Sequence, residues 1–378
     1  MTRRAEALLL FLVSPAALWG AALPHFTQPN AVWNEDASGA TLRANSAAMM
    51  THLEALAAAH PPNGLWGDNR GNVDFQIDFS FYALHAAGGA PTTVVVPYPD
   101  AINYFYPDCG DFNLPGQAPV PLPIPLPPGG GIEGTGPPNV AATPSYTCSN
   151  GSDDCHLLIQ QGTTLFESYA TNVTVSGVET TCALTWDLTR VYPRYGRGEH
   201  CTSADGAGFP IAPLLFNADE VWVAAQAHGD FGHAIRFIIG NTRMQLNTHV
   251  HPSSHGTSAT SDTNANAVPY GSHLRLKSTF NVNGFSSNEA VRAILRTLQK
   301  YGMFLSDGGG IPLTAESDYY TTHKWTDVGM KIDSHSLFGI KPTDFDVIEA
   351  GDPISNSSNG GNCTLTPADF IFIDGYDF

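Results

Sequence analysis

Short segments with strand-like patterning constrain this chain more than any other feature. Between residues 73 and 81, Val, Phe and Ile alternate with Asp, Gln and Ser, a period of two that is typical of a strand with one buried face. Further strand-like segments, separated by Gly, Asn, Asp or Pro, follow at residues 92–96, 156–160, 164–169, 184–188, 220–224, 234–239, 273–277, 279–282 and 304–306. Because few helices alternate with these strands, the sequence predicts a mainly β protein, built as an antiparallel β-sandwich or jelly roll.

Two helices are expected beside these strands. Apolar residues recur at helical spacing from Ser46 to His60, and the following Pro61-Pro62 would end that helix. A second apolar face runs over residues 289–301, where Ser286 followed by Glu289 matches a capping box. The predicted architecture is therefore mainly β with one or two short helices.

Composition divides the chain into five parts. Residues 1–22 place two arginines before an apolar run and a small-residue cleavage site, the pattern of a secretory signal peptide. Residues 23–113 are predicted to form the N-terminal part of a β domain and residues 145–350 its main part. The Pro- and Gly-rich residues 114–144 are a connector over the surface or a wall of a cleft, and residues 351–378 a flexible linker and tail. No later apolar run reaches the ~18 residues of a membrane span, so we expect a secreted monomer, extracellular or periplasmic.

Six cysteines in an exported chain are expected to form disulfides. Spacing favours Cys148–Cys155, then Cys182–Cys201, which leaves Cys109–Cys363. Sequence alone leaves the other connectivities open.

The charge balance narrows the partners. The chain has 17 Lys and Arg against 35 Asp and Glu, a formal net charge of −18. Nucleic acids and anionic membranes require a basic face, so neither is expected as a partner. Polyanionic glycans are disfavoured for the same reason, unless one local cationic patch serves them.

The densest group of polar and small residues lies at 197–208, where Asp205 is the first candidate for a catalytic carboxylate. General acid–base catalysis needs two carboxylates in different environments, and Glu167 and Asp187 lie on predicted strands. The alternatives are a turn-forming Asp205 and a solvent-facing position for the two strand acids. Trp186, beside Asp187, could stack on a sugar ring.

Other polar residues are candidates for orienting or binding a substrate. His156, His233 and Arg236 would orient it, while Arg275, Asp307 and His255 would bind it. The alternative for Arg275 is a structural ion pair, and for Asp307, which precedes three glycines, a plain turn.

Histidines at 249, 251 and 255 have a spacing that a metal site could use. On a strand, His249 and His251 would point to one face, and His255 would approach from the loop that follows. Because that loop is rich in Ser and Gly, the favoured interpretation is that these three bind no metal and that the protein has no cofactor. Signatures of serine hydrolases, P-loop proteins, dinucleotide-binding folds and zincins are absent from the sequence.

Residues 154–346 resemble a family of exported, β-rich bacterial proteins. The pieces that carry the resemblance occur in order at 155–158, 165–169, 186–188, 201–211, 219–221, 233–237, 269–271, 275–276 and 301–309. The resemblance implies a secreted β-rich protein and supplies no reaction. His255 belongs to the shared pattern and His249 and His251 do not, which weakens the metal interpretation.

These observations favour a secreted enzyme that hydrolyses glycosidic bonds of an extracellular polysaccharide or oligosaccharide. Asp205, together with Asp187 or Glu167, would supply the acid and the base or nucleophile. A polysaccharide lyase is one alternative, but it would need cationic side chains to neutralise a uronate, which the net charge disfavours. A non-catalytic carbohydrate-binding or surface protein is the other.

Overall fold

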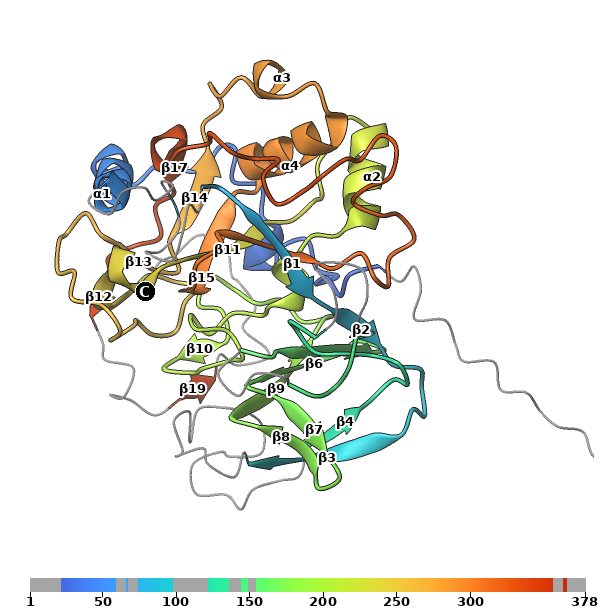
Figure 1. Cartoon of the computed structure of the whole chain (residues 1–378). Coiled ribbons are helices and arrows are strands. Elements are labelled where there is room, and N and C mark those ends of the chain that lie inside the picture. The colour runs from blue at the N-terminus through green and yellow to red at the C-terminus, as the bar shows by residue number, and fades with distance from the viewer. Residues whose placement is uncertain are drawn as a thin grey trace, which may run out of the picture.

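The computed structural model describes residues 22–58, 66, 74–97, 122–135, 144–148, 154–355 and 363–365 (Figure 1). Residues 1–21 of the predicted signal peptide, Cys109 and most of the predicted tail lie outside these ranges. Within the described residues, no helix is both long and apolar enough to cross a membrane.

A six-stranded mixed sheet forms the centre of one half of the molecule. Its strands, in spatial order, are β1 (Ile77–Phe81), β16 (Leu313–Glu316), β11 (Ile235–Ile239), β15 (Met303–Gly308), β14 (His273–Leu276) and β17 (Phe345–Val347). β1 runs parallel to β16 and β11 parallel to β15, whereas the other pairs are antiparallel. Apolar side chains such as Phe237, Leu305 and Phe345 are fully buried in its core.

Helices cover this half, and two smaller sheets form the other. Figure 1 shows α2, α3 and α4 at one end of the molecule and β3, β4, β7 and β8 at the opposite end. The helices are α1 (Ser46–Ala58), α2 (Ala218–Gln226), α3 (Val282–Phe285) and α4 (Glu289–Lys300), with 3-10 turns at Val32–Asn34, Ala212–Leu214, Asn241–Arg243 and Pro342–Asp344. α4 packs on α2 and on β14, and α1 packs on β17.

The remaining strands form four further sheets. One contains β2 (Ala83–His85), β5 (Leu157–Gln161), β6 (Thr164–Tyr169) and β9 (Cys182–Asp187), and another β4 (Pro123–Pro125), β3 (Thr92–Pro97), β8 (Gly177–Thr180) and β7 (Asn172–Thr174). The smaller ones contain β13 (Val268–Tyr270), β12 (Met244–His249) and β18 (Ile354–Ser355), and β10 (Gly198–Glu199) with β19 (Thr364–Leu365).

The predicted fold class is confirmed, because the described residues form mainly strands with few short helices. The expected antiparallel sandwich or jelly roll is not confirmed, because the described strands form several sheets and some of these are mixed. Parallel pairs, such as β2 with β5 and β3 with β8, occur where a jelly roll would be antiparallel throughout. They arise because segments from residues 77–97 pair with strands much later in the chain, which joins the N-terminal part to the main β domain.

Three local predictions are wrong. Residues 220–224 belong to helix α2 and not to a strand, because the Asn217 side chain accepts from the Glu220 backbone N–H and Glu220 closes the capping box. Residues 279–282 form a turn that enters α3. The cap of α4 is Asn288 and not Ser286, since the Asn288 side chain accepts from the Ala290 N–H.

The predicted connector and tail are both tied to the body of the molecule. Within 114–144, β4 pairs with β3, and Ile124 is 1% exposed. The Cys148–Cys155 disulfide is confirmed, whereas Cys363 pairs with Cys201. Cys182–Cys201 and Cys109–Cys363 are therefore wrong, although Cys182 is disulfide-bonded and none of the described cysteines is free. The tail thus returns to β10 beside Cys201, a long-range closure that spacing could not reveal.

Candidate functional site

A polar cavity of about 310 Å³ lies between the two halves of the molecule. Its walls come from four places: the loop after Cys201, the residues after β12, the ends of β13 and β15, and the start of the β5–β6 region. Six polar side chains in its wall are those of Asp154, Tyr169, Asp205, His255, Tyr270 and Asp307. Three of these six, Asp205, His255 and Asp307, are predicted site residues.

A buried ion pair forms the floor of the cavity. Arg236 on β11 donates through Nε to Oδ2 of Asp205 at 3.0 Å and through Nη2 to Oδ1 at 2.7 Å. Both side chains are almost fully buried. Two-pronged pairing of this kind fixes geometry as well as charge. Asp205 is therefore fixed at the cavity wall by Arg236, which contacts both of its carboxylate oxygens.

The Ser203 hydroxyl fixes the loop that carries Asp205. The Ser203 Oγ accepts from the Asp205 N–H at 3.0 Å and donates to the Phe209 carbonyl at 2.6 Å. Gly206 follows directly, and a Cβ there would overlap both Asp307 and the Tyr270 hydroxyl. Only glycine allows this loop to approach the end of β15 so closely.

Asp307 reaches the cavity because β15 contains a bulge. Phe237 pairs with Leu305 and Ile238 with Asp307, so that Ser306 is the extra residue of the pair. The Ser306 backbone carbonyl accepts from the Ala207 N–H at 2.7 Å, which joins this bulge to the Asp205 loop. An Oδ2 of Asp307 lies 3.5 Å from Nη2 of Arg236, and the side chain is 24% exposed. Burial, and then the charge of Asp205, raises the pKa of Asp307 to about 7.

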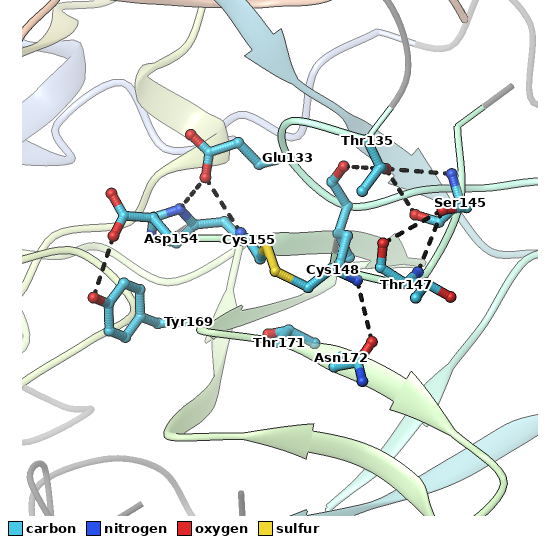
Figure 2. Close-up of a disulfide and its surroundings, with 12 residues drawn as sticks. Glu133, Thr135, Ser145, Thr147, Cys148, Asp154, Cys155, Tyr169, Thr171 and Asn172 are labelled. Atoms are coloured by element: carbon cyan, nitrogen blue, oxygen red, sulfur yellow. Dashed lines mark hydrogen bonds and ion pairs between the residues drawn. A yellow bond between two sulfur atoms is a disulfide. The ribbon is translucent and has the colours of Figure 1, made fainter. Parts of the chain in front are cut away.

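Asp154 is a second carboxylate at the cavity, and sequence reasoning missed it. The Tyr169 hydroxyl donates to Oδ1 of Asp154 at 3.2 Å. The Asp154 backbone carbonyl accepts from the Ala170 N–H at 2.8 Å. The adjacent Cys148–Cys155 disulfide fixes the chain beside it, as Figure 2 shows. Asp154 is solvent-exposed. Asp154 lies just before β5, outside any segment of alternating apolar and polar residues. Apart from its closeness to Cys155, nothing in the sequence marked it as a site residue.

Neutral polar groups complete the lining. Burial raises the pKa of Tyr270 well above its usual range, which keeps its hydroxyl protonated. Burial also lowers the pKa of His255 to about 4, so that this imidazole is neutral at pH 7. With the hydroxyls of Thr202 and Thr257, the cavity offers hydroxyl, imidazole and carboxylate groups to a ligand.

His156 positions the Asp205 loop from behind. Its Nδ1 faces Oε2 of Glu133 at 2.5 Å and its Nε2 faces the Ala204 carbonyl at 2.9 Å. Because both partners are acceptors, the ring carries two protons. Although burial opposes it, the Glu133 carboxylate raises the pKa of His156 to about 9. His156 therefore acts on the loop and does not line the cavity, contrary to its predicted contact with substrate.

Two predicted carboxylates do not join Asp205 at the cavity. Glu167 is fully buried and accepts from Trp186 Nε1 at 2.9 Å and from two backbone N–H groups. Asp187 is exposed at the end of β9, where its carboxylate accepts from the Thr189 N–H at 2.8 Å. The expected pairing with Asp205 rested on a Cys182–Cys201 disulfide that is not formed.

Three further predicted residues lie elsewhere. Trp186 is 1% exposed and packs against Trp33 and Tyr192, so that no sugar ring can reach it. Arg275 donates to the carbonyls of Ala37 and Ser38, and its Nη2 lies 4.0 Å from Oδ2 of Asp346, which agrees with the structural ion pair given as its alternative. His233 does not line the cavity and lies beside Glu220 instead.

Two groups of side chains in the described part of the chain have the spacing of metal ligands. One joins His249 and His251 to Glu199, and His255 is not part of it. The other joins His25, Glu220 and His233. Sequence spacing identified His249 and His251, but Glu199 and all three members of the second group come from distant segments that spacing could not join.

No family model, curated protein or solved structure matches this chain. The candidate site is therefore interpreted from its own geometry.

Proposed function

We propose that the cavity binds and hydrolyses a glycosidic bond of an extracellular polysaccharide or oligosaccharide. Asp307 is the general acid and Asp154 the second carboxylate, acting as nucleophile or base. The observation that supports this most is the contrast between the two: Asp307 is largely buried with a pKa of about 7, and Asp154 is exposed. Carboxylates whose environments differ in this way divide acid and base roles between them.

The lining favours a sugar over other substrates. Hydroxyl and carboxylate groups match the hydrogen-bonding edges of a polyol, and 310 Å³ is at the lower end of the roughly 300–1,000 Å³ of ligand sites. One or two sugar units would fill such a space. The guanidinium of Arg236 is already paired with Asp205, so that it is poorly placed to neutralise a uronate. This argues for hydrolysis over elimination.

The proposed chemistry assigns a role to each charged group. Asp307 donates its proton to the leaving oxygen as the glycosidic bond breaks. The resulting carboxylate is stabilised by Arg236, whose Nη2 is already 3.5 Å away. Asp154, oriented by Tyr169, either activates a water that attacks the anomeric carbon or attacks that carbon itself. In the second case a water, deprotonated by Asp307, then releases the sugar from Asp154. Asp205 is a positioning residue that fixes Arg236.

A polysaccharide array read for new reducing ends tests this proposal. Asp307→Asn should lose ~10²-fold or more of the activity found, because general acid catalysis contributes about that much. Asp187→Asn is the matched control and should keep full activity. Absorbance of unsaturated uronate would indicate a lyase, and glycan binding without turnover would indicate a binding protein; either result would overturn the hydrolase proposal.

We also propose that the chain is exported and cleaved near Ala22. The two disulfides and the absence of a membrane-spanning helix among the described residues are compatible with this. Thiol titration of the denatured, secreted protein should find no free cysteine, and two or more thiols per chain would contradict it.

A further inference from the structure

A cluster of metal-ligand side chains lies apart from the cavity, where the N-terminal segment meets α2. His25 comes from that segment, Glu220 from the first turn of α2, and His233 from the turn before β11. One nitrogen of each ring and one carboxylate oxygen lie within 4.8 Å of one another. Two imidazoles and a carboxylate are ligands typical of zinc and related divalent cations.

The backbone determines which nitrogen of each ring faces the cluster. Nδ1 of His25 lies 3.1 Å from the Pro213 carbonyl, and Nδ1 of His233 lies 2.7 Å from the Ala234 carbonyl. Because a carbonyl oxygen only accepts, both Nδ1 atoms carry a proton and donate it. Each Nε2 is then left to face Glu220. Metal-bound histidines are commonly oriented by this type of hydrogen bond to a carbonyl.

His233 is the residue that an ion pair alone does not explain. It is 3% exposed, and its Nε2 has no hydrogen-bond partner among the described residues. Because Nδ1 donates its proton to the Ala234 carbonyl, Nε2 of the neutral ring presents a lone pair to the cluster. It lies 3.8 Å from Oε1 of Glu220, which is another acceptor. A protonated His25 satisfies Glu220 but leaves His233 facing an acceptor.

A cation between these atoms would satisfy all three. Bonds of about 2.0–2.1 Å in tetrahedral geometry separate ligand atoms by roughly 3.4 Å, close to the 3.8 Å between His233 and Glu220. His25 Nε2 instead contacts Oε1 of Glu220 directly, so that these two side chains must move apart to admit an ion. Oε2 of Glu220 accepts from the Asn217 N–H at 3.3 Å, which holds the carboxylate and leaves Oε1 for a metal. Glu220 also lines a cavity of about 430 Å³, whose lining residues do not include His25 or His233.

We propose that His25, Glu220 and His233 bind one zinc-type divalent cation, with a solvent molecule in the fourth position. The ion fastens the N-terminal segment to α2 and to the turn before β11. This site is separate from the cavity and does not depend on glycan hydrolysis. The Glu199, His249 and His251 group is a natural control, because there the carboxylate is 37% exposed and contacts both rings.

Zinc uptake by the untagged mature chain tests the proposal. Protein stripped with a chelator is dialysed against zinc, and its metal content and Tm are measured. We expect one zinc per chain and a higher Tm, as binding to the folded state alone requires. His233→Gln and Glu220→Gln should abolish this tight site, a larger loss than the ~10–100-fold caused by an outer hydrogen-bond partner.

The variants are chosen to separate binding from folding. The Glu220→Gln variant can still complete the capping box of α2 but loses the charged contact with His25. The readout is therefore the difference in Tm between zinc and chelator for each variant, which should vanish in Glu220→Gln. His251→Ala should retain the zinc. Uptake that survives His233→Gln and Glu220→Gln, uptake lost only in His251→Ala, or no zinc above the buffer level would each overturn the proposal.

Discussion

Asp307 and Glu167 are two carboxyl groups near the same Asp205, but Asp307 is partly exposed at the cavity and Glu167 is fully buried. Burial raises the pKa of each to about 7, and the charge of Asp205 contributes to both. Glu167 is 0% exposed and is surrounded by the indole N–H of Trp186 and the backbone N–H groups of Ile211 and Ala212. Asp307 accepts from the Gly308 N–H, contacts Arg236 and faces the cavity. A perturbed pKa therefore indicates a site only where the group can also reach a ligand.

Removing the Arg236 guanidinium, which contacts Asp205 and Asp307, should have the largest effect on stability. Arg236→Met leaves the Asp205 carboxylate buried without its partner, which should lower the free energy of unfolding by about 3–5 kcal/mol. Urea denaturation measures this. Lys300→Met, which breaks the more exposed pair with Asp230, is the control and should cost at most about 1 kcal/mol. Equal costs in both variants would mean that the Arg236–Asp205 pair is not the anchor of the site.

Paired substitutions at the two carboxyl groups sharpen the comparison. Glu167→Gln should lower the free energy of unfolding by about 1–3 kcal/mol, because the new amide meets N–H donors, and it should keep glycan turnover. Asp307→Asn should do the reverse, with activity lost and stability nearly unchanged. Denaturation and turnover of the same two samples give the answer. If Glu167→Gln were inactive and Asp307→Asn active, the role of general acid would belong to the buried Glu167 and not to Asp307.

The Glu133–His156 pair predicts a pH dependence behind the cavity. The pKa of His156 is raised from 6.5 to about 9 in the folded protein, so that its stabilisation is complete below pH 6.5 and is lost as the pH rises through 9. We expect unfolding free energy to fall over this range by an amount on the order of 2 kcal/mol. His156→Gln should flatten that fall. A profile with the same slope in the variant would contradict the assignment.

The smallest effect is expected at Asp187. Its side chain makes a local turn contact with Thr189, and asparagine makes the same contact. Asp187→Asn should change the unfolding free energy by less than about 0.5 kcal/mol, as measured by urea denaturation. A larger loss would mean that this strand end supports the cavity.

Local patterns in the sequence predicted much of the fold. Strands β3, β5, β6, β11 and β14 and helix α1 lie close to their expected positions, because alternation and turn residues are local signals. Helix α2 was missed although Asn217 and Glu220 have capping-box spacing, since its short apolar run also fits a strand. The burial of Trp186 and Glu167 depends on segments from elsewhere in the chain, such as Trp33 and Ile211.

The site was predicted in part. Asp205, Arg236, His255 and Asp307 come together as expected of functional candidates, with Arg236 buried beneath the cavity. The partner of Asp205 could not be predicted, because Arg236 reaches it only through pairing of β11 and β15. His25 and Glu220 are 195 positions apart, so that no spacing rule could join them.

The central claim is that Asp307 is an accessible acid that is still protonated near neutral pH. A ¹³C-carboxyl NMR titration of aspartate-labelled protein, with Asp307→Asn to assign the signal, tests it most directly. The account predicts one signal with a midpoint near pH 7 that is missing from the variant. An Asp307 signal with a midpoint near the ordinary value of 3.8 would contradict it.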